Sequence, residues 1–82
     1  MAKLKLLYEG EEQGEYEIQA GETLSIGRRD SNDVVIENLI VSGAHAKLDA
    51  LDEGFLLTDL RSKNGTFVNE TPINSHWLQD GD

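Results

Sequence analysis

Short segments in which apolar and polar residues alternate run along the chain, and they constrain its fold more than any other feature. In residues 44–50 every second residue is Ala or Leu, and His, Lys and Asp stand between them. This two-residue period is typical of a half-buried β-strand. No segment of helical length carries an apolar stripe with the 3.6-residue period of a helix.

From this alternation, and from the Gly-, Asp- and Asn-rich turns between the segments, we predict strands at residues 3–8, 15–19, 23–27, 34–36, 44–50, 55–60 and 66–69. Many closely spaced short strands are typical of an all-β sandwich or barrel. Eighty-two residues suffice for one such domain, and we expect it to span residues 1–82. The absence of Cys, of a signal peptide and of a long apolar run favours a cytoplasmic protein with no membrane partner.

The charged residues are unevenly distributed. The net charge of −9 argues against a nucleic-acid partner, because such polymers are bound through excess Lys and Arg. Four of the seven basic residues nevertheless fall in two short segments, 28–29 and 61–63. If these segments meet in the fold, they form one positive spot suited to a single compact anion.

Residues in and near these segments are those with which proteins bind phosphate. Arg forms two parallel charge-assisted hydrogen bonds, and hydroxyl and ammonium groups add further donors. The candidate donors are Arg28, Ser42, Ser62 and Lys63. A Ser42, His45 and Asp59 triad is the alternative, but no strained nucleophile turn accompanies it. With two His and no Cys, we also expect no metal site. We therefore expect no catalytic residue and no enzyme.

Three motifs follow in order along the chain: Gly27-Arg28, then Ser42-Gly-Ala-His45, then Ser62-Lys-Asn-Gly-Thr-Phe-Val-Asn69. Together they resemble the forkhead-associated (FHA) domain, and the resemblance extends to residues 24–26, 31–36 and 78–82. It implies a β-sandwich of short antiparallel strands whose end loops bind phosphothreonine in an extended peptide, without a cofactor. The implied partner is a phosphothreonine-containing protein, such as a Ser/Thr kinase or its substrate.

The resemblance also implies a role for each matching residue. Arg28 and Ser42 match the phosphate-binding pair, Lys63 stands where the family often places a second phosphate contact, and Asn64 matches the residue that binds the peptide main chain. Four further signature positions are expected to keep the loops in shape: Gly27, His45, Gly65 and Asn69.

The sequence departs from the family pattern at two places. Gly43 stands where a larger polar or basic side chain is common, which predicts weaker binding. The pattern also continues past Asp82 into a final strand pair beside the first strand, so we expect a C-terminally truncated domain with an open edge at residues 3–8. That edge and Gly43 favour the alternative function, a phosphate-independent module for protein assembly or dimerisation.

Overall fold

The computed structural model describes residues 2–82, and this part of the chain folds into strands with no helix. Residues 2–82 therefore contain no helix that could cross a membrane. The strands are β1 (Ala2–Tyr8), β2 (Glu11–Ile18), β3 (Thr23–Gly27), β4 (Val34–Val35), β5 (Ala46–Leu51), β6 (Gly54–Asp59), β7 (Thr66–Val68), β8 (Thr71–Ile73) and β9 (Ser75–Trp77). The all-β fold class is confirmed.

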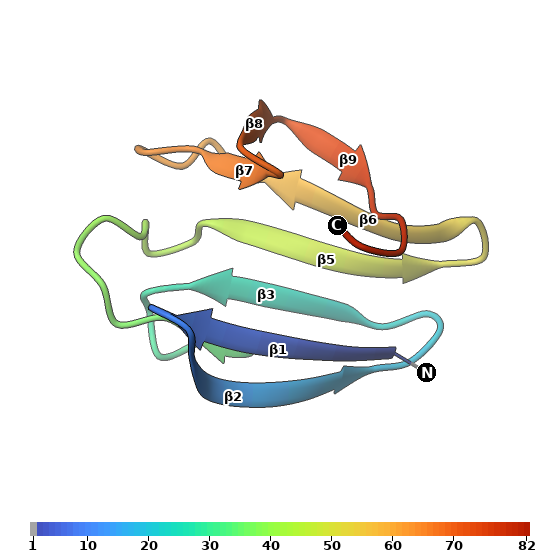
Figure 1. Cartoon of the computed structure of the whole chain (residues 1–82), viewed down its shortest axis with the longest axis horizontal. Helices are drawn as coiled ribbons and strands as arrows, with labels where there is room; N and C mark the ends of the chain where they lie inside the picture. Colours follow the sequence, from blue (N-terminus) through green and yellow to red (C-terminus); the bar gives the residue numbers. More distant parts are fainter. Residues whose placement is uncertain (1) are drawn as a thin grey trace.

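The strands form a five-stranded sheet and two hairpins (Figure 1). The strand order in the large sheet is β4-β3-β5-β6-β9. Neighbouring strands are antiparallel, except that β3 and β4 are parallel. The hairpins are β1-β2 and β7-β8. The core joins the layers, because Ile18 of β2 packs against Leu48 and Ala50 of β5, all three at most 4% exposed. This is a β-sandwich, as predicted.

The alternation predicted the core side of β5 correctly over most of its length. Ala46, Leu48 and Ala50 are buried. The strand begins at Ala46, however, and Ala44 is exposed. The cause is local, since the residues before β5 belong to a loop that bonds to the end of β3, with the His45 N–H donating to the carbonyl of Ile26.

The first hairpin is longer than predicted. We predicted strands at residues 3–8 and 15–19 with a longer connection between them, but β2 begins at Glu11 and the turn consists of Glu9 and Gly10. Both turn residues have positive φ, as a two-residue hairpin turn requires. Lys3 and Glu15 form a cross-strand ion pair at 3.5 Å, so the Glu residues face basic partners instead of forming a loop. Strands β8 and β9 were also missed, because three residues are too few to show a period.

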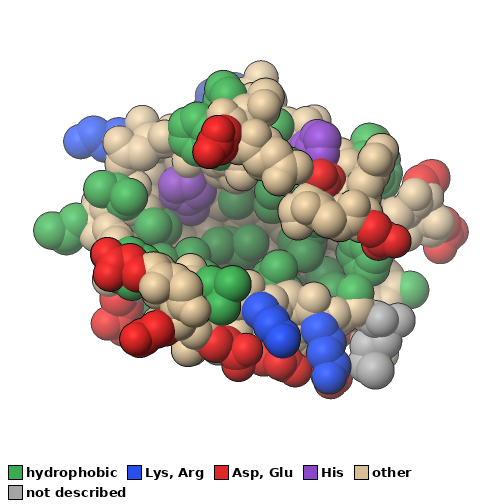
Figure 2. All heavy atoms as spheres, in the orientation of Figure 1, with side chains coloured by type: hydrophobic (Ala, Val, Ile, Leu, Met, Phe, Trp, Pro, Cys, Tyr) green, Lys and Arg blue, Asp and Glu red, His purple; other side chains and the backbone are tan. Residues whose placement is uncertain are grey.

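Both hairpins have a free strand edge in the part of the chain that the structure describes. There β1 pairs only with β2, and β7 only with β8. Figure 2 shows apolar side chains gathered in a hollow between the β1-β2 hairpin below and the β7-β8 region above. The expected final strand pair beside β1 stays a prediction.

Candidate functional site

Four predicted contact residues line one open pocket at the end of the sandwich. Arg28, Ser42, Lys63 and Asn64 come from three loops, and residues 39–41 with Gly43 complete a lining that encloses about 320 Å³. We call this the loop pocket. The two basic segments therefore do meet in the fold. A larger hollow of about 540 Å³ lies between the first hairpin and β4, but no Lys or Arg lines it.

The first two loops are joined through their backbones. The Arg28 N–H donates to the carbonyl of Ser42 at 3.0 Å, and the Arg29 N–H donates to the carbonyl of Gly43 at 3.2 Å. This approach is so close that a Cβ on Gly27 would clash with the Gly43 carbonyl oxygen. Gly27 is thus required to place Arg28 beside Ser42.

His45 connects the second loop to the third. Its Nδ1 accepts a hydrogen bond from the Ser42 N–H at 3.1 Å, so the ring proton lies on Nε2, which donates to the carbonyl of Gly65 at 2.9 Å. Gly65 itself has a φ of 88°, a left-handed conformation that favours glycine. Through these contacts His45 joins two of the loops that line the pocket.

Asp59 organises the third loop, and the sequence alone did not indicate this. Its carboxylate accepts hydrogen bonds from the Ser62 N–H, the Ser62 hydroxyl and, at 2.8 Å, the Thr66 hydroxyl. Partial burial by itself would raise the pKa of Asp59, but these hydrogen bonds outweigh it and hold the pKa below the usual range. The loop from 61 to 65 is therefore anchored on a carboxylate that stays ionised.

These bonds decide which hydroxyl faces a ligand. The Ser62 hydroxyl donates to Asp59 and accepts from the Gly65 N–H, so its proton is already used. The Ser42 Oγ accepts from the Lys63 N–H at 2.9 Å, and its own proton has no acceptor among residues 2–82. Ser42 can therefore donate to an anion in the loop pocket, whereas Ser62 is a structural residue.

Asn64 uses one of its two amide protons inside the protein. Its Nδ2 donates to the carbonyl of Ile40 at 2.6 Å, which fixes the loop before Ser42. Its Oδ1 has no donor in the described chain, so it can accept an N–H from a bound peptide.

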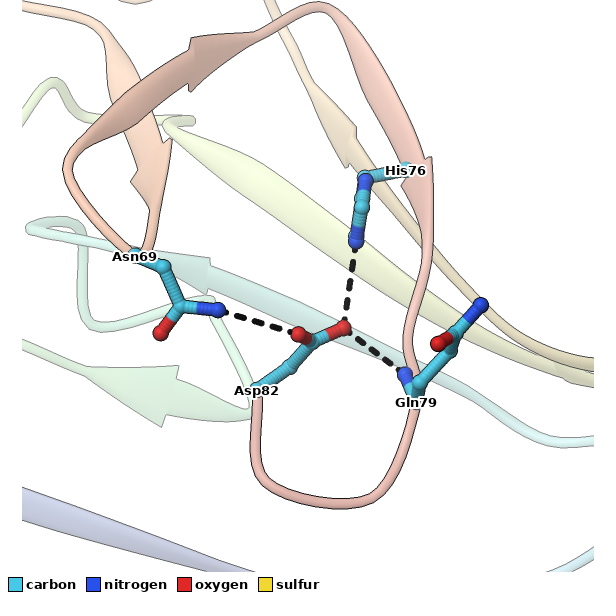
Figure 3. Close-up of polar contacts among 4 residues, drawn as sticks. All are labelled: Asn69, His76, Gln79 and Asp82. Atoms are coloured by element: carbon cyan, nitrogen blue, oxygen red, sulfur yellow. Dashed lines mark hydrogen bonds and ion pairs between the residues drawn. The ribbon is translucent and has the colours of Figure 1, made fainter.

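Asn69 lies outside this network. It begins the β7-β8 turn, and its Nδ2 donates to the Asp82 carboxylate at 3.1 Å (Figure 3). The same carboxylate accepts from the Gln79 N–H at 2.7 Å and contacts His76 Nε2 at 3.1 Å. The Gln79 hydrogen bond, with help from His76, lowers the pKa of Asp82. Asn69 thus connects the β7-β8 turn to the C-terminal turn.

The charge pattern favours an anionic ligand. Lys3, Lys5 and Lys47 each pair with a carboxylate. The other four cations, all in the two basic segments, form no ion pair within residues 2–82: Arg28, Arg29, Arg61 and Lys63. Over the same residues, no group of three His, Cys, Asp or Glu side chains is placed to hold a metal ion.

The arrangement differs from a catalytic triad. His45 accepts from the Ser42 backbone N–H, and its other nitrogen meets a carbonyl instead of Asp59. The Asp59 carboxylate is used by Ser62 and Thr66. Within residues 2–82 no base is therefore paired with the Ser42 hydroxyl, as a Ser-His-Asp triad would require.

A sequence profile of the FHA domain matches residues 24–82. The oxoglutarate dehydrogenase inhibitor of Corynebacterium diphtheriae is 38% identical over 60 residues, which are 73% of this chain but 42% of that protein, so the chain spans less than half of this relative.

Solved structures agree with the profile. The crystal structure of an FHA domain from Chlamydia trachomatis is 30% identical and has a TM-score of 0.84, over 93% of this chain and 78% of that one. A structure from an analysis of phosphothreonine-dependent FHA domain interactions has a TM-score of 0.78 at 29% identity, over 96% of this chain and 78% of that one. Because the profile covers more than half of its residues, the chain belongs to the FHA family.

Proposed function

We propose that the loop pocket binds the phosphate of a phosphothreonine in an extended peptide, and that the chain is a module for phosphorylation-dependent protein interaction. One observation carries this proposal: the Ser42 hydroxyl, whose proton has no acceptor among residues 2–82, lies in the same pocket as Arg28 and Lys63, which form no ion pair within those residues. The phosphothreonine-dependent interactions of an FHA domain of similar structure support it.

Each group has a distinct role in this mode of binding. Arg28 donates two charge-assisted hydrogen bonds to the phosphate, Lys63 adds a second positive charge, and Ser42 donates its hydroxyl proton. Asn64 accepts an N–H of the peptide main chain through Oδ1. The peptide is therefore recognised by the charge of one residue and by the backbone beside it.

The net negative charge of the molecule limits which classes of partner it can bind. With a net charge of −9, the chain repels nucleic acids and anionic membrane surfaces, whereas one phosphate meets only the local cations. We place its partners among phosphorylated cytoplasmic proteins, a Ser/Thr kinase or its substrate. We propose a module that binds and does not catalyse, because within residues 2–82 His45 bonds to the Ser42 backbone and not to its hydroxyl.

Isothermal titration tests the proposal with a phosphothreonine peptide, its unphosphorylated form and the Arg28→Ala variant. A hydrogen bond to a charged group contributes about 1.5 to 3 kcal/mol, so the variant should lose roughly tenfold or more in affinity. Arg61→Ala is the matched control, since it removes an unpaired Arg that does not line the pocket. Equal losses in the two variants would refute a specific role for Arg28.

The second candidate is a phosphate-independent assembly module. Leu39 and Ile40, 88% and 64% exposed, form an apolar rim beside the loop pocket and favour it. This function predicts that phosphorylated and unphosphorylated peptides bind equally, and that the purified chain self-associates through the rim. A dimer that dissociates in a Leu39→Ser variant, measured by analytical ultracentrifugation, would support the second candidate over the first.

A further inference from the structure

Gly43 leaves a space beside Ser42, and the side chain of Arg29 fills it. A Cβ placed on Gly43 would lie 2.7 Å from Arg29 Nε, 3.1 Å from Cγ and 3.2 Å from Cζ. In folded proteins a Cβ atom essentially never lies within 3.0 Å of a non-bonded heavy atom. The Arg29 side chain can therefore lie across this loop only because residue 43 is glycine.

The backbone beneath Arg29 is fixed from several directions. Its N–H donates to the Gly43 carbonyl, and its own carbonyl accepts from the backbone N–H of Asn32 at 3.1 Å and from Asn32 Nδ2 at 2.9 Å. Asn32 Nδ2 also donates to the Gly43 carbonyl at 2.7 Å. Residues 29, 32 and 43 thus form one rigid base from which the Arg29 side chain extends.

The guanidinium of Arg29 has no carboxylate partner among residues 2–82. It lies over Gly43, which lines the loop pocket, while Arg29 itself is outside the lining. A phosphate bound in the pocket would therefore contact Arg28 and Lys63, whereas Arg29 would contact a part of the peptide just outside the pocket. The planar guanidinium fork matches a carboxylate.

We propose that Arg29 is a specificity-determining residue that binds the carboxylate of an acidic residue flanking the phosphothreonine. This inference rests on the proposed function of the loop pocket. Away from the two basic segments the acidic surface repels a peptide carboxylate, so we expect the preference at the one flanking position that reaches Arg29. An exposed ion pair of this kind is expected to improve affinity by about two- to fivefold.

A peptide panel tests the inference. A phosphothreonine peptide with Ala at the three positions on each side is compared with six versions in which one Ala is replaced by Glu, and each is also made unphosphorylated. Affinities are measured by fluorescence anisotropy for the wild type, Arg29→Ala and the control Arg61→Ala. The expected result is one Glu position that improves wild-type and Arg61→Ala binding two- to fivefold, and gives no improvement in Arg29→Ala.

Three other outcomes overturn the inference. One is a wild type with no preference for Glu at any position. Another is an Arg29→Ala variant that keeps the preference for Glu. The third is an Arg29→Ala variant whose affinity falls equally for every phosphopeptide, since Arg29 would then contact the phosphate. In all three the phosphorylated peptides still bind more tightly than their unphosphorylated forms. Equal binding of those forms instead refutes the proposed function, and the inference with it.

The space at residue 43 provides a second, independent check. Gly43→Ala places a methyl group where Arg29 lies. The single substitution should therefore displace the Arg29 side chain and reduce the preference for Glu. In the Arg29→Ala background the same substitution should have no further effect on the Glu preference. Additive effects of the two substitutions on that preference would contradict the packing of Arg29 over Gly43 as its cause.

Discussion

Replacing Asp59 by Asn should loosen the third loop of the pocket without touching the ligand. The Asp59 carboxylate accepts three hydrogen bonds, two from Ser62 and one from Thr66, and the Ser42 Oγ accepts the N–H of the next residue, Lys63. An Asn side chain has the same size but only one acceptor oxygen, and its NH₂ group would face donors. At least one of the three bonds is therefore lost.

The size of the effect follows from these bonds. A hydrogen bond to a charged group contributes about 1.5 to 3 kcal/mol, and the three donors share one carboxylate, so their contributions do not add. We expect Asp59→Asn to lower the free energy of unfolding by about 2 kcal/mol at neutral pH. For a domain of this size that corresponds to a decrease in Tm of about 8 to 16 °C.

The loss should depend on pH in a defined direction. The pKa of Asp59 is lowered in the folded state relative to about 3.9 in an unfolded chain. Its ionisation therefore stabilises the fold fully above the unfolded pKa, and this contribution disappears as the pH falls through the folded pKa. The difference between wild type and Asp59→Asn should be largest at pH 6 to 7 and should shrink steadily below pH 4.

Thermal unfolding followed by circular dichroism between pH 2.5 and pH 7 measures this difference. Asp52→Asn serves as the matched control, because it removes an exposed carboxylate that accepts no side-chain hydrogen bond within residues 2–82. The reasoning is refuted if Asp59→Asn unfolds like Asp52→Asn at neutral pH. It is equally refuted if the loss of stability is the same at pH 2.5 as at pH 7.

Three further predictions concern the pocket and the second hairpin. Ser42→Ala removes a hydroxyl donor to the phosphate and should weaken phosphopeptide binding at least about tenfold in isothermal titration. Wild-type affinity should fall several-fold from pH 7 to pH 5, because the second pKa of the phosphate is about 6; unchanged affinity at pH 5 would contradict the charge-based mechanism. Glu70 has a φ of 68° in the β7-β8 turn, so Glu70→Gly should raise Tm by about 2 to 8 °C, and a lowered Tm would refute this.

Patterns with a fixed period were sufficient for the core. Alternation identified Ala46, Leu48 and Ala50 as inward-facing, because a strand next to a packed layer permits only one face to be apolar. The loop motifs likewise placed Arg28 and Ser42 in one pocket. In both cases the information lies in residue types at constant spacing, which the sequence shows directly.

Contacts between loops carry no such period, and the sequence did not show them. Ser62 has the chemistry of a phosphate donor, yet its hydroxyl bonds to Asp59, which stands three residues before it. Asn69 was expected to keep the loops in shape, and the sequence did not indicate that its partner is Asp82 in the C-terminal turn. Which of several possible hydrogen bonds a polar side chain makes depends on backbone geometry that only the folded chain defines.

The effect of the missing side chain at Gly43 depends on which neighbouring residue fills its space. In the sequence it predicts a gap beside Ser42 and weaker binding. In the structure, Arg29 occupies that space from the neighbouring loop, so a cation remains beside the pocket although it comes from a different residue. A guanidinium supplied from residue 29 extends from another backbone position than a side chain at residue 43 would. The positive charge is thus supplied from a different backbone position, which is why we propose that Arg29 affects the choice of flanking residue more than the affinity for the phosphate itself.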